Sequence, residues 1–148
     1  MVIIAGCVIK KDNKILMVQE AKESYYGQWN IPAGHADETE QLTETAIREV
    51  YEETGCKVKL TGVLPIVKVD INGKSHFHVK FMADLIEENI KFDKKEILDV
   101  KWIDIEELKN MSDKELRGYE INSNHIRNAE NNNVFPLEIF DTTKYVRK

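Results

Sequence analysis

The sequence has little of what marks proteins that bind nucleic acids or membranes. Basic residues are in the minority, with 21 Lys and Arg against 26 Asp and Glu among 148 residues, a formal net charge of −5. Broad binding to nucleic acid or to anionic membranes requires a basic surface, so this composition disfavours both as partners. The opening MVIIAGCVIKK is too short for a signal peptide or a membrane span and has no basic region ahead of it. We therefore expect a cytoplasmic protein.

Cysteine is scarce, and repeats and linkers are missing. The chain has two cysteines, Cys7 and Cys56, both flanked by apolar residues. A disulfide would require that the fold bring them together, and we favour two buried thiols in a reducing compartment. Since the length suits one hydrophobic core and no composition shift divides the chain, we expect one domain over residues 1–148.

Two turn signals organise the β-rich runs of the first half. Asp12-Asn13 separates two apolar runs, and Asn72-Gly73 is a strong hairpin signal between alternating apolar residues. A further apolar run carries Trp102. The expected strands lie within residues 2–9, 15–18, 57–71, 77–81 and 97–103.

Helical patterns alternate irregularly with these runs. One helix is expected to begin between Asp37 and Gln41, capped by Asp37 or Thr39, and to end at Gly55. Other helices are expected over residues 104–110 and 113–129, with loops over 21–28 and 87–95. The segment 135–140 is expected to pack back or to form a last strand. Because strands and helices mix without strict alternation, the fold class is an α+β or α/β sandwich.

The segment from 34 to 56, GHADETEQLTETAIREVYEETGC, places three acids on one side of the first helix. Glu49, Glu52 and Glu53 stand at i, i+3 and i+4, so their side chains share a face. Crowded carboxylates raise one another's pKa. A hard divalent cation removes that penalty, because it takes oxygen ligands.

The competing interpretation is a solvated acidic face, which is what a charge run usually is. At about 100° per residue, Glu49 and Glu53 each fall about 20° from Leu42, which belongs to the apolar stripe. A solvated face predicts the opposite placement. Buried charges are rarely tolerated without a partner or a metal, so we favour the metal site.

The same segment resembles the Nudix box. That pattern is Gly, five residues, Glu, seven residues, Arg-Glu-hydrophobe, one residue, Glu-Glu, one residue, Gly-hydrophobe. Its fixed positions are filled by Gly34, Glu40, Arg48, Glu49, Val50, Glu52, Glu53 and Gly55, with Cys56 in the last hydrophobic place. The resemblance implies the Nudix fold, a mixed β-sheet between helices with the box as a loop–helix–loop.

The resemblance also implies roles for the residues of the box. Mg²⁺, for which Mn²⁺ substitutes, would be bound by Glu49, Glu52, Glu53 and the carbonyl of Ala33, which stands where the family usually has Gly. Glu52 is expected to be the indispensable acid. The other fixed positions of the box are expected to shape the loop and orient the glutamates. They are Gly34, Glu40, Arg48 and Gly55, and Glu40 and Arg48 are expected to form an ion pair.

A further carboxylate usually comes from outside the box, ahead of a strand that bears Trp. Glu96 lies six residues before Trp102, and Asp99 lies three before it. We choose Glu96 as auxiliary ligand or general base, so the expected catalytic set is Glu52, Glu53 and Glu96. The alternative, a solvated loop acid, stays open because this loop is charged throughout.

Candidate substrate contacts are Tyr25, Tyr26, His35 and His78. The two tyrosines lie in a loop, and aromatic rings can stack on a base. His78 shares one face of a strand with His76, which is either the substrate cleft or the outer face. Lys22 could pair with phosphate, His125 could approach from the last helix, and Trp29 is expected to be a packed structural residue.

Function follows from the resemblance. The segments WNIPAGH at 29–35 and FPL at 135–137 are similar to sequences of the phosphatase-type Nudix subgroup. This similarity implies hydrolysis of phosphoanhydride bonds in nucleoside di- and triphosphates, or in a nucleoside diphosphate linked to another group. Alternatives are a thiamin-type pyrophosphate phosphatase, a catalytically silent ligand sensor, and an RNA-cap-removing or RNA-binding protein. The complete box argues against the sensor and the acidic composition against an RNA channel. Family members are often homodimers, which the sequence leaves open.

Overall fold

The computed structural model describes residues 1–148 and contains eight strands and three α-helices. The strands are β1 Val2–Lys11, β2 Lys14–Glu20, β3 Trp29–Asn30, β4 Ala33–His35, β5 Lys57–Val63, β6 Val67–Ile71, β7 Lys74–Glu87 and β8 Ile97–Asp104. The helices are α1 Leu42–Thr54, α2 Ile105–Lys109 and α3 Tyr119–Glu130, and short 3₁₀ turns cover Glu23–Tyr25 and Leu137–Ile139.

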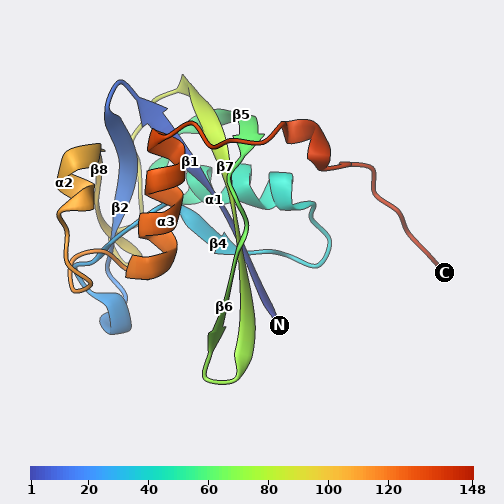
Figure 1. Cartoon of the computed structure of the whole chain (residues 1–148), viewed down its shortest axis with the longest axis horizontal. Coiled ribbons are helices and arrows are strands. Elements are labelled where there is room, and N and C mark those ends of the chain that lie inside the picture. Colours follow the sequence, from blue (N-terminus) through green and yellow to red (C-terminus); the bar gives the residue numbers. More distant parts are fainter.

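The strands form one mixed sheet whose main path is β3-β2-β1-β7-β5 (Figure 1). β1 and β7 run parallel over residues 2–9 and 76–83, and the other pairings are antiparallel. β4, β6 and β8 pair with β1, β7 and β2 respectively. The predicted mixed sheet between helices is therefore confirmed.

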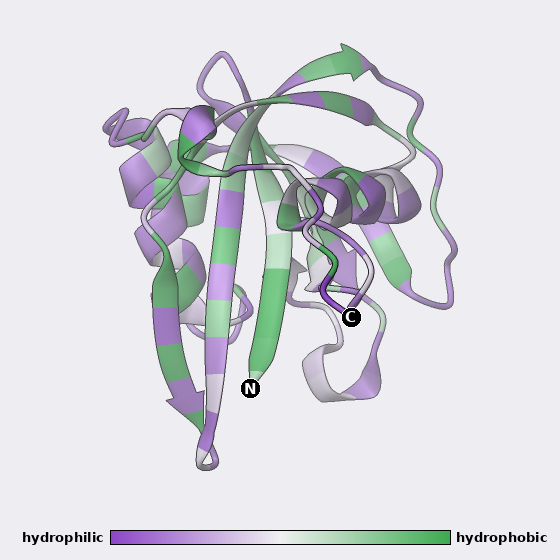
Figure 2. Ribbon diagram, turned by 90° about the vertical axis from the view of Figure 1, so that its right-hand side faces the viewer, coloured by the Kyte–Doolittle hydropathy of each residue, from purple (hydrophilic) through white to green (hydrophobic).

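Helices lie on both sides of the strands, and two hydrophobic clusters fill the two interfaces (Figure 2). Alternate residues of a strand point to opposite faces. Along β1, Cys7 and Ile9 pack with Ala46 and Val50 of α1, whereas Val8 packs on the side of α2 and α3. This alternation fixes α1 against one face and α3 against the other.

The first helix starts one residue later than predicted, and its expected cap was wrong. Gln41 precedes the helix, and its backbone N–H donates to the Glu44 carboxylate over 3.0 Å. Asp37 instead accepts hydrogen bonds from the backbone and hydroxyl of Thr39, which stabilise the preceding turn. Gly55 ends the helix in the left-handed region with φ 78°, as predicted.

Both predicted hairpin turns are present, but the predicted helix over 113–129 begins only at Tyr119. Before it, the backbone around Leu116 pairs with Trp29, since Trp29 N donates to Glu115 O and Arg117 N donates to Trp29 O, each over 2.8 Å. Gly118, with φ 52°, then turns the chain into α3. This long-range pairing competes successfully with helix formation and brings Arg117 to the sheet.

The other predictions hold in part. The run over 57–71 is two strands, β5 and β6, separated by a break around Pro65. Phe135 makes an isolated bridge to Val63, and Phe140 packs on Phe81 with ring centroids 5.2 Å apart, so the segment 135–140 packs back without forming a strand. Cys7 and Cys56 are buried free thiols. None of the helices has both the length and the apolar character needed to cross a membrane.

Candidate functional site

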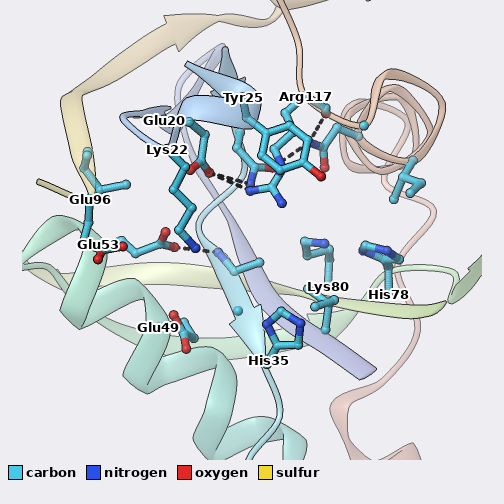
Figure 3. A pocket seen from close by; sticks show the side chains of 18 of the residues that line it. Glu20, Lys22, Tyr25, His35, Glu49, Glu53, His78, Lys80, Glu96 and Arg117 are labelled. Carbon is cyan, nitrogen blue, oxygen red and sulfur yellow. Dashed lines mark hydrogen bonds and ion pairs between the residues drawn. The ribbon is translucent and has the colours of Figure 1, made fainter. Parts of the chain in front are cut away.

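A cavity of about 700 Å³ opens between the last turns of α1, the first half of β7 and the start of α3 (Figure 3). Its size is typical of small-molecule sites. The polar residues that line it include Glu20, Lys22, Tyr25, Asn30, His35, Glu49, Glu52, Glu53, His76, His78, Lys80, Asp93, Glu96, Arg117 and Asn122.

The three acids of α1 all line this cavity, and two of them lie inward. Glu49 and Glu53 are partly buried, as the helical wheel predicted, whereas the Glu52 side chain is 54% exposed. Burial raises the pKa of Glu49 and raises that of Glu53 well above its ordinary value. At Glu53 the hydrogen bond from Ala33 N, 2.8 Å long, opposes this rise without cancelling it.

Arg48 connects the acids of the helix to the preceding loop. Its Nε and Nη2 donate to the two carboxylate oxygens of Glu40 over 2.8 and 2.9 Å. Its Nη1 donates to Glu49 over 2.9 Å and to Glu52 over 3.2 Å. This pairing lowers the pKa of Glu40 and raises that of Arg48. A bidentate ion pair has a fixed geometry, so the loop and helix are held in register.

The loop passes close to α1 at Gly34. A Cβ added to Gly34 would collide with the carboxylate of Glu49. The backbone therefore lies directly against one of the acids. Its neighbour Ala33 donates its backbone N–H to Glu53, so the main chain of Ala33 also lies beside the acids of α1.

These groups fit a hard divalent cation by their chemistry. Glu49, Glu52, Glu53 and the Ala33 carbonyl are the residues that would hold it, because Mg²⁺ prefers oxygen ligands. Burial penalises the charged form of Glu49 and Glu53, and a cation would remove that penalty. No three His, Cys, Asp or Glu side chains converge as a ready ion site. Arg48 Nη1 pairs with both Glu49 and Glu52.

Of the two acids considered outside the box, only Glu96 reaches the cavity. It lies in the turn before β8, on the same side of the cavity as Glu53 (Figure 3). Asp99 lies within β8, accepts from Val100 N over 2.8 Å and pairs with Lys101 at 3.7 Å. Asp93, which sequence reasoning did not select, also lines the cavity.

A stacked pair forms a second side of the cavity. The Arg117 guanidinium lies 3.8 Å from the centroid of the Tyr25 ring, and its Nη1 donates to Glu20 over 3.1 Å. Glu20 is only 3% exposed and also accepts from Asn30 over 3.1 Å. Tyr26, expected beside Tyr25, does not line the cavity and is 67% exposed. The 3₁₀ turn directs only one tyrosine inward.

The histidines divide between the cavity and the interior. His35, His76 and His78 line the cavity, so their strand face is not an outer face. Burial lowers the pKa of His78 to about 4. His125 does not line the cavity; it is fully buried, has no hydrogen-bond partner at either ring nitrogen, and burial lowers its pKa to about 2. Both imidazoles are neutral at pH 7.

Several lining residues escaped the sequence analysis. Arg117, Asn30 and Asn122 gave no local signal, because they come from segments that only the fold brings together. Asn122 Nδ2 donates to Asn30 Oδ1 over 2.8 Å. Glu20 and Lys80 did carry a usable signal, since each is a charge within a strand-forming run. A charged residue in a strand is usually exposed to solvent, but Glu20 and Lys80 are both buried.

Comparison with known proteins gives a consistent assignment. A family model described as the NUDIX domain matches residues 2–124. Nucleoside diphosphate-linked moiety X motif 6 of Xenopus laevis is 33% identical over 110 residues, which are 71% of this chain and 50% of that protein. The 8-oxo-dGDP phosphatase NUDT18 of Danio rerio is 43% identical over 53 residues, 36% of this chain and 16% of that protein.

Among solved structures, a NUDIX hydrolase from Nitrosomonas europaea superposes with a TM-score of 0.85 at 24% identity. The match covers 96% of this chain and 97% of that one, and it shows a shared fold. The chain spans between 26% and 50% of the length of the first curated relatives that it matches. Their whole-protein activities therefore do not transfer directly.

Proposed function

The chain belongs to the Nudix family, and on this basis we propose that it hydrolyses phosphoanhydride bonds with the help of a divalent metal. Its substrate would be a nucleoside di- or triphosphate, or a nucleoside diphosphate linked to another group. The observation that supports this most directly is the cavity, where the α1 acids face a space shared with the Tyr25–Arg117 stack.

The two sides of the cavity suit the two chemical parts of such a substrate. Bound Mg²⁺ or Mn²⁺ would neutralise phosphate oxygens and lower the pKa of water. Glu49, Glu52, Glu53 and the Ala33 carbonyl would hold it. The stack of Tyr25 and Arg117 offers a flat surface with a positive charge, which suits a base or a phosphate.

We assign the acceptor of the water proton to Glu96. It is exposed at the cavity edge, and no ion pair or side-chain hydrogen bond holds its carboxylate. Glu53 and Glu49 are constrained by Ala33 and Arg48 respectively. A general base must be free to reach the proton that it takes, which favours Glu96 over either.

The name of the Danio rerio relative states action on 8-oxo-dGDP, which agrees with the phosphatase-type similarity of residues 29–35. We therefore place nucleoside diphosphates, oxidised guanine nucleotides included, ahead of thiamin-type pyrophosphates. The buried thiols of Cys7 and Cys56 are compatible with a reducing, cytoplasmic compartment.

A substrate panel tests the proposal. The protein with Mg²⁺ is given nucleoside di- and triphosphates, nucleoside diphosphate sugars and thiamin pyrophosphate, and orthophosphate and pyrophosphate are measured separately. The matched control is Glu53→Gln, which removes charge but keeps an oxygen for Ala33 N. Turnover of a nucleotide that this variant loses supports the proposal. Binding without turnover of any member of the panel would instead favour the silent sensor.

A further inference from the structure

One buried cation in the cavity has no counter-ion. Lys80 lies in the middle of β7, beside Gly6 of β1, and is only 2% exposed. It nevertheless lines the cavity, on the same side as His78 and across from Glu53 and Glu96 (Figure 3). Its ammonium group forms no ion pair or hydrogen bond, and its neighbours act on it only through space.

None of the groups around Lys80 forms an ion pair or a hydrogen bond with its ammonium group. The Cys7 thiol has its pKa raised to about 12 by burial, so it stays neutral. His78 and His125 are neutral imidazoles, and Arg117 is a second cation. Glu53 is the remaining acid, and its carboxylate accepts from Ala33 N over 2.8 Å and forms no ion pair with Lys80. Glu20 forms its ion pair with Arg117 and not with Lys80.

Burying an ammonium group without a partner costs folding free energy. Such a group is therefore expected where it binds a counter-ion or has a function. An ordinary surface lysine would extend its tip to solvent. Burial lowers the pKa of Lys80 to about 8, so it still carries its charge at pH 7. The cavity that Lys80 lines can admit a counter-ion from outside.

We propose that Lys80, which lines the same cavity as Arg117, forms an anion-binding subsite there, which takes a phosphate or carboxylate group of the substrate. This subsite is distinct from the α1 acids, which hold metal in the proposed function, and it would favour substrates with an anionic group beyond the metal-bound one. The inference rests on the proposed function only in assigning the anion to a substrate.

Binding of simple anions tests the subsite without turnover. With a chelator present, inorganic phosphate and acetate are titrated by calorimetry into the wild type, Lys80→Met and Lys59→Met. Lys59 is an exposed β5 residue outside the cavity, so its variant controls for the loss of one charge. We expect Lys80→Met to weaken phosphate binding by at least about 10-fold, and Lys59→Met to change it less than about twofold.

The two anions identify the group that is bound. A Lys80-dependent loss for phosphate assigns a phosphate, and the same loss for acetate alone assigns a carboxylate. Equal binding of both anions to wild type and Lys80→Met would overturn the subsite. Methionine has a similar length and no charge, so the variant is expected to fold, and a thermal melt checks this.

A measurement on the wild type removes any dependence on that variant. The ¹H–¹³C signal of the Lys80 ε-methylene group is followed by NMR during the phosphate titration. A saturable shift of this signal, larger than that of Lys59, supports the proposal, and a Lys80 signal that stays fixed contradicts it. If no nucleotide is hydrolysed while this shift is seen, the proposed function fails and the subsite stands. If hydrolysis occurs with a KM that Lys80→Met leaves unchanged and no shift is seen, the subsite fails alone.

Discussion

The backbone N–H of Ala33 donates a hydrogen bond to Glu53 Oε1 over 2.8 Å, and so joins the loop before α1 to the last turn of that helix. The contact joins a main-chain amide and a carboxylate that are 20 residues apart in the sequence. Gly34, next in the chain, lies close to the carboxylate of Glu49. Backbone contacts therefore hold the loop before α1 against Glu49 and Glu53.

Activity should depend completely on a divalent ion. The physical reason is that the α1 acids crowd together, and burial disfavours the charge of Glu49 and Glu53. Removal of metal by exhaustive chelation should abolish turnover, and addition of Mg²⁺ or Mn²⁺ should restore it. The measurement is the rate of phosphate release over a metal titration, and turnover that persists after chelation would exclude the metal assignment.

Glu52→Gln and Glu53→Gln should each lower kcat by at least about 10²-fold, because each removes a charge from the expected metal site without changing its shape. Steady-state kinetics at saturating Mg²⁺ measures the effect. Near-normal turnover in both variants would mean that α1 is not the catalytic centre.

The free energy of unfolding without metal should differ between the Glu52 and Glu53 variants. The folded pKa of Glu53 is raised, so folded protein binds a proton that unfolded protein releases, and this contribution lowers stability as the pH rises above about 4.5. Glu53→Gln should remove that loss and stabilise the metal-free protein at pH 7. Glu52 is an exposed partner of Arg48, so Glu52→Gln should change stability little. Chemical unfolding at several pH values distinguishes these outcomes.

Glu96→Gln should lower kcat, or weaken metal binding, by roughly 10-fold or more, whereas Asp99→Asn should have a much smaller effect. Glu96 lines the cavity, and Asp99 is held by Val100 N and Lys101 away from it. Paired kinetics over a Mg²⁺ titration and a pH series test this. A pH profile altered in the Asp99 variant, with Glu96→Gln behaving as wild type, would reverse the two roles.

The buried histidine predicts how the protein responds to acid. The folded pKa of His125 is lowered from 6.5 to about 2, so between these values the unfolded state binds a proton that the folded state does not. Stability should therefore fall as the pH drops below about 6.5, by up to about 1.4 kcal/mol per pH unit from this residue. His125→Leu should reduce that slope and lose no hydrogen bond, because neither ring nitrogen has a partner.

Urea unfolding of the wild type and His125→Leu from pH 7 to pH 4 measures the difference in slope. His78, with its pKa lowered to about 4, adds to the acid sensitivity of both proteins in the same range. His76→Leu, at a residue that lines the cavity, serves as the comparison for loss of a histidine. An unchanged slope in the His125 variant would show that this ring accepts a proton in the folded state.

The sequence by itself determined the elements whose signals are local. The Asn72-Gly73 turn needs positive φ at both residues, which are 52° and 77° here, and the dipeptide supplies it. The i, i+3, i+4 spacing places the α1 acids on one face whatever surrounds the helix, and Gly55 ends that helix because it alone tolerates the left-handed conformation without cost. Fold class and the box followed from such features.

Only the tertiary structure decided which distant residues share the cavity. Residues 113–117 have helical composition, yet residues 115–117 pair with Trp29, because backbone hydrogen bonds to a sheet edge replace those of a helix turn. That pairing brings Arg117 to Tyr25 and Glu20. Lys80 is marked in the sequence as a charge within a strand-forming run, but its burial in the cavity wall, among residues of β2, α1 and α3, depends on long-range packing. Long-range packing determines which residues become neighbours in the cavity, and no local sequence pattern predicts it.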